Sequence, residues 1–308
     1  MKSTIECYNK VNKDCFKFIK SQETAKEKFK NKEKMIKSFL VPISFWIASK
    51  AKNKKPFIVG LGGGQGTGKT TITSIISIIL KKYFKLNVFK ISIDDFYKTK
   101  KERILLSKKV HPSLITRGVP GTHDVSSMFS FFKRVKSKNF RALKLPKFNK
   151  AIDDRYNKKL WHSIKKKPDI IIFEGWCVGA RAEKNNSLKK AINSLEKNND
   201  KKLIWRKFVN QQLKLKYKKL YTQLDCMLFL KANNFRLLQQ WRLKQEKKLW
   251  LKNKRSRNNK IMNKKDVIKF MQTYQRITQN MLKHAPKYSS MILNLNRNHQ
   301  IKSVKYKL

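Results

Sequence analysis

One segment of the chain limits the possible folds more than any other. Residues 63–70 read GGQGTGKT and fit the pattern G-x-x-x-x-G-K-[ST] in full. A short apolar run at 57–59 ends near the glycines, and apolar residues recur beyond them at helical spacing: Ile72, Ile75, Ile76, Ile79 and Leu80. A strand, a glycine-rich loop and a helix in this order hold phosphate with backbone N–H groups and a helix N-terminus. The segment therefore predicts a phosphate-binding loop (P-loop) rather than a chance glycine-rich turn.

The loop also predicts which residues hold a nucleotide. Lys69 would reach the β- and γ-phosphates, and the hydroxyl of Thr70 would face Mg²⁺. ATP and Mg²⁺ are therefore the expected cofactors. The expected nucleotide-binding residues are the loop and the start of the helix: Gly63, Gly64, Gln65, Gly66, Thr67, Gly68, Lys69, Thr70 and Thr71.

Four more short apolar runs follow the first one along the chain. They cover residues 88–93, 170–173, 227–230 and 291–295, and helical or loop-rich stretches separate them. Apolar strands that alternate with helices are typical of a parallel sheet covered on both faces. The expected fold class is α/β, of the P-loop NTPase type, with a five-stranded parallel sheet and helices on both of its faces.

Acidic residues end two of these strands. The second strand runs into Asp94 and Asp95, and the third ends at Glu174, so all three would lie at the sheet edge that carries the P-loop. A carboxylate there can accept a proton from an attacking hydroxyl and assist the metal. A turn or helix cap is the alternative for a single Asp, but two adjacent acids stand out in a chain that has 19. Glu174 follows a continuously apolar, central strand and is expected to hold Mg²⁺ directly or through water.

Two loop-like stretches between the second and third strands suggest an acceptor pocket. They read RGVPGTHD at 117–124 and PKFNKAIDDR at 146–155, and both mix turn formers with charged residues. Their cations would pair with an anionic acceptor, although each lysine taken singly fits a solvated charge equally well. The expected substrate residues, including two at the end of the second strand, are Asp95, Tyr97, Arg117, His123, Asp124, Lys150 and Arg155.

A helical stretch after the fourth strand, NFRLLQQWRLKQE at 234–246, looks like a kinase lid. Arg236 and Arg242 lie within two turns of each other, and either would close over the phosphates to neutralise charge in the transition state. The alternative is a basic surface helix. We take Arg242 as the catalytic candidate.

The charge balance is the most unusual feature of the composition. The chain has 75 Lys plus Arg against 19 Asp plus Glu, a net charge of +56. Such an excess suggests a nucleic acid or an anionic membrane surface as partner, or else compositional drift. Lys outnumbers Arg by 62 to 13 and is spread over almost every block of the sequence. This favours drift, because a nucleic-acid reader would concentrate its charge and use Arg.

Other sequence features bear on location. No stretch reaches the roughly 18 uncharged apolar residues that a bilayer span needs. Charges interrupt the first twenty residues, where a signal peptide needs a continuous apolar segment. The four cysteines form no C-x-x-C pair, which favours thiols in a reducing compartment. We therefore expect a cytoplasmic protein without a membrane partner.

The motifs, taken in order, resemble those of a known family. GGGQGTGKTT, SIDDFY, RGVPGTHD, LPKFNKAIDDR, IIFEGW and WRLKQE are similar to the P-loop kinases related to D-glycerate 3-kinase, which are near uridine kinase, phosphoribulokinase and pantothenate kinase. The resemblance spans about residues 55–300. It implies transfer of the γ-phosphoryl group of ATP to a hydroxyl of a small molecule, with Mg²⁺. It also implies Asp94, two places before Phe96, as the base and Glu174 as the metal-holding glutamate.

These observations lead to one expected organisation. Residues 1–54 would form a helical extension packed on a P-loop kinase domain of residues 55–308, with an acceptor-binding insertion and a lid at about 234–262. A Lys-rich segment at 183–219 would be a solvated helical excursion on the surface. The expected reaction is phosphorylation of D-glycerate to 3-phosphoglycerate. Uridine, pantothenate or another sugar acid are alternative acceptors, and a nucleic-acid-binding P-loop ATPase is the competing class.

Overall fold

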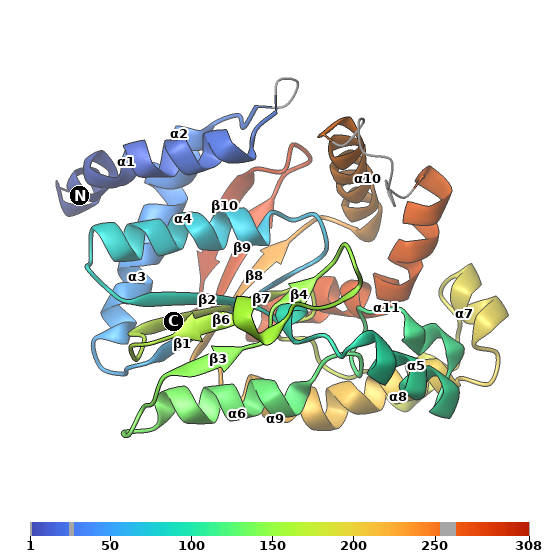
Figure 1. The fold of residues 1–308 in the computed structure, drawn as a ribbon. Coiled ribbons are helices and arrows are strands. Elements are labelled where there is room, and N and C mark those ends of the chain that lie inside the picture. The colour runs from blue at the N-terminus through green and yellow to red at the C-terminus, as the bar shows by residue number, and fades with distance from the viewer. Residues whose placement is uncertain (1, 25–27, 253–262, 308) are drawn as a thin grey trace.

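A central sheet organises the molecule (Figure 1). The computed structural model describes residues 2–24, 28–252 and 263–307, and for 248–252 it describes the backbone alone. Its six-stranded sheet has the order β10-β9-β8-β1-β7-β2. The strands are β1 (Phe57–Gly63), β2 (Val88–Ser92), β7 (Ile170–Gly175), β8 (Cys226–Lys231), β9 (Met291–Leu295) and β10 (Ile301–Tyr306). The five predicted strands are present and mutually parallel, and β10 adds an antiparallel edge strand that was not predicted.

Helices cover both faces of this sheet, as predicted. Alternate residues of β1 and β7 enter different apolar clusters: Val59 and Ile172 join one, and Ile58 and Ile171 join the other. The first cluster lies under α1 (Lys2–Gln22), η1 (Met35–Leu40), α3 (Val41–Ala51), α4 (Lys69–Lys82) and α10 (Phe235–Lys252). The second lies under α6 (Val125–Lys136), α8 (Ile204–Gln212), α9 (Lys218–Tyr221) and most of α11 (Lys264–Tyr288). A sheet buried on both faces explains why its strands read as continuous apolar runs.

The elements between β2 and β7 are helix α6, which covers one face of the sheet, and a set of shorter helices and strands. They are η2 (Ile93–Phe96), α5 (Lys100–Lys109), η3 (Pro112–Ile115), α6, β3 (Leu143–Leu145), β4 (Phe148–Asn149), β5 (Asp154–Arg155), η4 (Lys158–Leu160) and β6 (His162–Ile164). β3 pairs with β6, and β4 pairs with β5, each antiparallel. This region holds both predicted acceptor stretches.

The N-terminal helices pack directly on the P-loop helix. α1, α2 (Lys32–Lys34), η1 and α3 come before β1. Cys7, Val11, Cys15 and Ile19 recur on one face of α1 and are buried in the same cluster as the apolar face of α4. In Figure 1, α1 lies along α4 on the side away from the sheet. These helices therefore share the core of the sheet.

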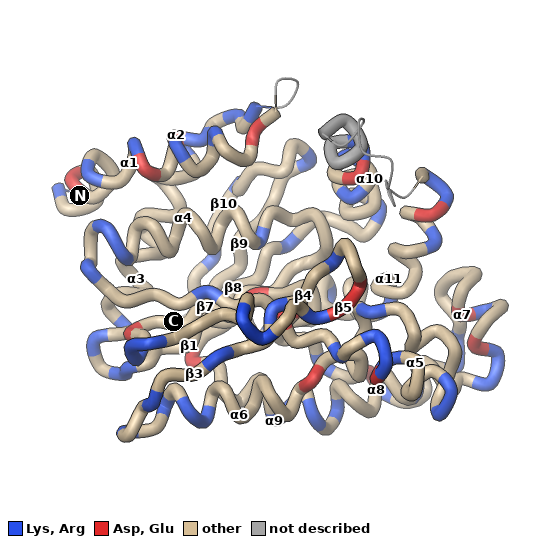
Figure 2. The backbone as a smooth tube through the Cα atoms, viewed as in Figure 1, with Lys and Arg blue, Asp and Glu red and all other residues tan. Residues whose placement is uncertain are grey.

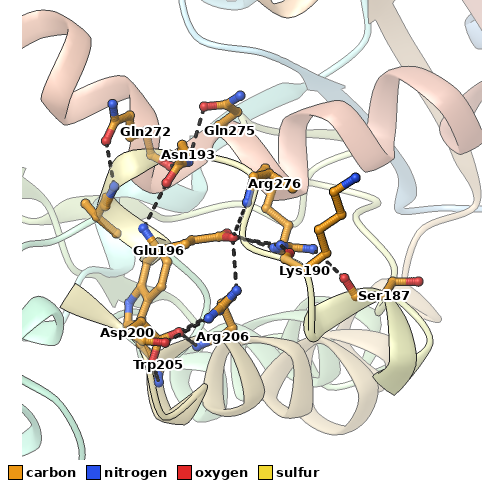
Figure 3. Close-up of polar contacts among 12 residues, drawn as sticks. Ser187, Lys190, Asn193, Glu196, Asp200, Trp205, Arg206, Gln272, Gln275 and Arg276 are labelled. Atoms are coloured by element: carbon orange, nitrogen blue, oxygen red, sulfur yellow. Dashed lines mark hydrogen bonds and ion pairs between the residues drawn. The ribbon is translucent and has the colours of Figure 1, made fainter. Parts of the chain in front are cut away.

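The segment at 183–219 differs from the solvated excursion that we expected. It forms η5 (Asn185–Leu188), α7 (Ser194–Asn199), α8 and η6 (Leu213–Tyr217). Trp205 and Tyr217 are buried in the second cluster, and Glu196 is 0% exposed. Figure 3 shows Glu196 between Arg206 of α8 and Arg276 of α11. The lysines face solvent, but the apolar face and these paired charges make the segment part of the core, because buried charges persist only when paired.

Helix hydropathy and charge distribution concern the molecule as a whole. Among the residues that the structure describes, no helix is long and apolar enough to cross a bilayer. Lys and Arg occur along most elements in the view of Figure 2, and the acidic residues are few and scattered.

Candidate active site

The P-loop connects β1 to α4 at the carboxyl edge of the sheet. Gly66 and Gly68 have φ angles of 78° and 82°, which glycine adopts without steric cost. Lys69 folds its side chain back over the loop, and its Nζ donates to the carbonyls of Gly63 at 3.0 Å and Gly64 at 3.1 Å. Burial lowers the pKa of Lys69, while Glu174 and Asp94 oppose that shift.

Thr70 and Glu174 face each other beside the loop. The Thr70 Oγ1 lies 3.3 Å from Glu174 Oε1. In the sheet, Glu174 is in register with Leu61 on one side and Ser92 on the other, so β7 carries its carboxylate to the P-loop. Burial raises the pKa of Glu174, and the Lys69 ammonium opposes that rise. Two of the three residues predicted to hold the metal, Thr70 and Glu174, are therefore in contact, and Asp94 is the third.

Asp94 lies in η2, directly after β2. Its Oδ1 accepts a hydrogen bond from the Tyr97 hydroxyl at 3.0 Å, and its Oδ2 lies 2.6 Å from Lys150 Nζ. Burial raises the pKa of Asp94, but Lys150 and the Tyr97 hydroxyl outweigh it, so the pKa ends below its usual value. Lys150 in turn has a raised pKa because of Asp94. Asp94 is thus an ionised carboxylate between the P-loop region and the β4–β5 hairpin.

Asp95, the neighbouring acid, accepts hydrogen bonds from the backbone of two separate segments. Its Oδ2 accepts from the backbone N–H of Ser92 at 3.4 Å in a capping box at the start of η2. Its Oδ1 accepts from the Phe148 N–H at 3.4 Å, and His162 Nε2 lies 3.2 Å from its Oδ2. These contacts join the end of β2 to β4 and β6.

Arg117 and Lys150 lie together on the acceptor side. Arg117 pairs with Asp153 and donates to the Lys150 carbonyl at 3.4 Å. Its guanidinium carbon is 5.4 Å from the centre of the Phe148 ring. The Arg117 side chain is 27% exposed and that of Lys150 is 62% exposed, so both cations remain accessible, Lys150 beside Asp94 and Arg117 beside Lys150.

His123 and Tyr97 are buried side by side next to Asp94. Their rings stack with centroids 4.5 Å apart, and the two residues share an isolated β-bridge. His123 Nδ1 lies 2.6 Å from the Tyr217 hydroxyl, which also accepts from the Gly121 N–H at 3.2 Å. Burial lowers the pKa of His123 to about 4. The imidazole is therefore neutral at physiological pH and supplies no charge for an anion.

Asp124 and Arg155 form an ion pair with each other. Asp124 caps α6 by accepting from the Ser127 N–H at 3.0 Å and the Ser127 hydroxyl at 2.7 Å. Arg155 donates to Asp124 Oδ2 at 3.3 Å and to the Tyr97 carbonyl at 2.9 Å. Both side chains therefore hold the acceptor loops in shape. The sequence had predicted that they contact the substrate.

Helix α10 lies against the P-loop. A Cβ built on Gly66 would be 3.2 Å from Trp241 Cβ and 3.4 Å from the Arg242 backbone N. Arg242 pairs with Glu246, and its Nε is buried without a hydrogen-bond partner among the described residues. Arg236 is exposed. The structure thus brings Arg242 to the loop, while residues 253–262 of the expected lid lie outside the described residues.

Three residues of this region were missed by sequence reasoning. Arg103 is 0% exposed and donates to the carbonyls of Lys98, Ile115 and Asp153. Tyr274 of α11 and Tyr217 of η6 contact the acceptor loop at Arg117 and at Gly121, respectively. Arginine is scarce in this chain, and that scarcity was the available signal for Arg103. The tyrosines lie on apolar helix faces, and such a pattern predicts core residues rather than site residues.

The chain resembles known kinases in its sequence and in its fold. No protein-family model matches the chain. An uncharacterized kinase of Schizosaccharomyces pombe, mug58, is 30% identical over 228 residues, which cover 71% of this chain and 79% of that protein. Chloroplastic D-glycerate 3-kinase of Arabidopsis thaliana is 26% identical over 199 residues, or 62% of this chain and 41% of the plant protein. The chain belongs to the P-loop kinases related to D-glycerate 3-kinase.

The fold of this kinase agrees with the family. D-glycerate 3-kinase from Cryptococcus neoformans superposes with a TM-score of 0.74 and 21% identity, covering 89% of this chain and 99% of that one. A likeness at this identity shows the fold, and it includes the sheet that carries the P-loop. The chain is therefore a kinase, as the motifs predicted.

Proposed function

We propose that this kinase transfers the γ-phosphoryl group of ATP to the 3-hydroxyl of D-glycerate. The observation that carries the proposal is the ionised Asp94 carboxylate 2.6 Å from Lys150 Nζ, with Arg117 beside them. A base for a hydroxyl thus adjoins cations for a carboxylate, which suits a small hydroxy acid better than an uncharged nucleoside. A relative named D-glycerate 3-kinase supports the same acceptor.

The P-loop holds the phosphate tail of ATP. Backbone N–H groups of the loop and the N-terminus of α4 would hold this anion, and the positive φ angles of Gly66 and Gly68 set the turn of the loop. Lys69 exchanges its bonds to the Gly63 and Gly64 carbonyls for the β- and γ-phosphates. That exchange keeps the ammonium paired throughout, which offsets its desolvation.

The residues beside the loop fit Mg²⁺. This ion prefers oxygen ligands and is held by one or two carboxylates together with phosphates and several waters. Thr70 Oγ1 and Glu174 Oε1, 3.3 Å apart, supply oxygens of that kind. When bound, Mg²⁺ neutralises charge on the β- and γ-phosphates. Asp94 lies close enough to Glu174 to influence its pKa, which is consistent with a part in orienting the ion's waters.

Asp94 orients and deprotonates the acceptor. The substrate hydroxyl takes the place of Lys150 Nζ at Asp94 Oδ2, and Lys150 turns to the substrate carboxylate. The hydroxyl oxygen then forms a bond to the γ-phosphorus, the bond from that phosphorus to the bridging oxygen of ADP breaks, and the proton moves to Asp94. Because the transition state is loose, positioning and charge neutralisation supply most of the acceleration. The backbone of Arg242 lies against the loop, and its guanidinium, once released from Glu246, would supply positive charge there.

A substrate panel tests this function. ADP release is measured with D-glycerate, L-glycerate, pantothenate and uridine, and ³¹P NMR identifies the product. We expect the highest kcat/KM for D-glycerate, 3-phosphoglycerate as the product, and no activity in Lys69→Ala, whose folded state is checked by circular dichroism. A higher kcat/KM for pantothenate or uridine would replace the acceptor while leaving the kinase chemistry in place.

A further inference from the structure

Tyr274 of α11 lies where three separate segments of the active site meet. Its side chain is 3% exposed. Burial raises the pKa of Tyr274, and the side chain of Gln65, in the P-loop, opposes that rise from beside the hydroxyl, which donates to the Arg117 carbonyl at 3.3 Å. The Gln65 Oε1 is buried without a hydrogen-bond partner among the described residues, so the amide NH₂ is the group of Gln65 that can donate to the tyrosine. One phenol therefore bridges the nucleotide loop and the acceptor loop.

The acceptor loop is shaped to receive this phenol. Gly118 has a φ of +142°, and a Cβ built there would be 2.1 Å from the Tyr274 hydroxyl. Trp176, which follows β7, donates from its Nε1 to the Gly118 carbonyl at 3.1 Å and packs edge-on against Tyr274, with ring centroids 4.7 Å apart. The phenol is thus fixed between two loops and an aromatic ring, with little room to move.

The opposite face of α11 is fastened to the 183–219 segment. Arg276 donates to both carboxylate oxygens of Glu196 at 2.7 Å. The Gln272 side chain accepts from the Leu195 N–H, and its backbone carbonyl accepts from Asn193 (Figure 3). These contacts hold the turn that carries Tyr274. The helix turn that carries Tyr274 is therefore anchored on its opposite face.

The contacts continue from Tyr274 to the catalytic ion pair. Arg117, whose carbonyl accepts from Tyr274, donates from its guanidinium to the Lys150 carbonyl at 3.4 Å. Lys150 Nζ then lies 2.6 Å from Asp94. A contiguous series of polar contacts thus runs from Gln65 in the P-loop to Asp94 at the base position.

We propose that Tyr274 is a positioning residue that couples nucleotide binding to the order of the acceptor loop. Nucleotide in the P-loop fixes Gln65, Gln65 fixes the Tyr274 hydroxyl, and this hydroxyl fixes residues 117–118 together with the hairpin that carries Lys150. The enzyme then presents a formed acceptor pocket only when the phosphoryl donor is in place. The proposal rests on the nucleotide site of the proposed function and is independent of which acceptor is used.

Hydrogen exchange measured by mass spectrometry tests the coupling without any acceptor. The probe is a non-hydrolysable ATP analogue with Mg²⁺, and the readout is exchange in peptides covering 116–124 and 148–155. In the wild-type enzyme we expect the analogue to slow exchange there by about fivefold or more, the usual lower range of coupling between sites. In Tyr274→Phe this effect should disappear, while slowing in the P-loop peptide remains.

The matched control is Tyr288→Phe, on the same helix. Its hydroxyl donates to the Gly179 carbonyl at 2.9 Å, away from both loops, so nucleotide-dependent slowing should match the wild type. Gln65→Leu provides a second break in the same series and should reproduce the loss if Tyr274→Phe does not fold. Retention of the effect in Tyr274→Phe, or its absence in the wild type, would overturn the proposal. A failure of D-glycerate in the substrate panel would leave this result unchanged.

Discussion

Lys150 Nζ lies 2.6 Å from Asp94 Oδ2, and this ion pair joins the β4–β5 hairpin to the end of β2. The two residues are far apart in sequence and come from segments that the sequence assigned to different tasks. Their contact gives Asp94 a lowered pKa in spite of its burial. The pair thus keeps the base ionised until an acceptor arrives.

The two adjacent aspartates should have different mutant phenotypes. Asp94→Asn should lower kcat by about 10²–10⁴-fold, the usual contribution of a positioned base, with nucleotide affinity nearly unchanged. Asp95→Asn should instead lower the free energy of unfolding by about 1–3 kcal/mol, because it weakens bonds to buried backbone N–H groups. Steady-state kinetics and urea unfolding distinguish them. A larger kcat loss in Asp95→Asn would move the base to Asp95.

Removal of Lys150 should shift the acid limb of the pH profile. Asp94 acts as base in its ionised form, and Lys150 holds its pKa below the usual value while burial acts upward. In Lys150→Met the Tyr97 hydroxyl and His123 still lower the pKa of Asp94, but its largest opponent of burial is gone, so the pKa rises and activity should be lost at a higher pH as the solution is acidified. The measurement is kcat/KM against pH. Lys147→Met, three residues away with its ammonium over the Tyr156 ring, is the control. Coincident acid limbs in the two variants would count against the ion pair.

The two lid arginines should differ in their effect on turnover. Arg242 adjoins the P-loop at Gly66, and its Nε has no hydrogen-bond partner in the described part of the chain. Arg242→Met should lower kcat by about 10³-fold or more, as for other arginines that neutralise a phosphoryl-transfer transition state. Arg236→Met, at an exposed position on the same helix, should stay within about twofold of the wild-type kcat. Equal effects of the two substitutions would contradict a specific role of Arg242 and would indicate that only the total positive charge of α10 matters.

The buried charge network should dominate the stability of the 183–219 segment. Glu196→Gln removes a carboxylate shared by Arg206 and Arg276 at a site with 0% exposure, while Arg206 keeps Asp200 and Arg276 keeps Glu183 as partners. We expect a loss of about 1–3 kcal/mol in the free energy of unfolding, since charged hydrogen bonds at a buried site are lost. Asp14→Asn breaks an exposed pair with Lys82 and should cost about 0–1 kcal/mol. Urea unfolding measures both, and similar losses would contradict the role of Glu196.

Several elements were predictable because their signals are local. The P-loop lies within eight consecutive residues, and its flanking strand and helix read directly from apolar spacing. The five parallel strands were found since strands buried on both faces are continuous apolar runs. β10 was missed because IKSVKY at 301–306 mixes lysine and serine with apolar residues and is mostly exposed at the sheet edge. Its place depends on pairing with β9, which no local pattern encodes.

Acidic residues were harder to assign. Asp169 and Asp225 also flank strands, yet they lie at the amino edge, where they accept from the N–H groups of Asn87 and Ile58. Asp124 and Arg155 were expected in the acceptor pocket, and the structure pairs them with each other. A carboxylate's task depends on which donors surround it, and those donors come from distant parts of the chain.

The amino-acid sequence by itself determined the nucleotide loop, the parallel sheet and the kinase class, because each depends on contiguous residues whose spacing sets backbone geometry. Only the tertiary structure decided which cation faces Asp94, that residues 183–219 belong to the core, and that Tyr274 bridges two loops. Those outcomes depend on contacts between side chains some 50 to more than 200 residues apart. Burial and charge pairing settle such contacts collectively, and they have no signature in any short stretch of sequence.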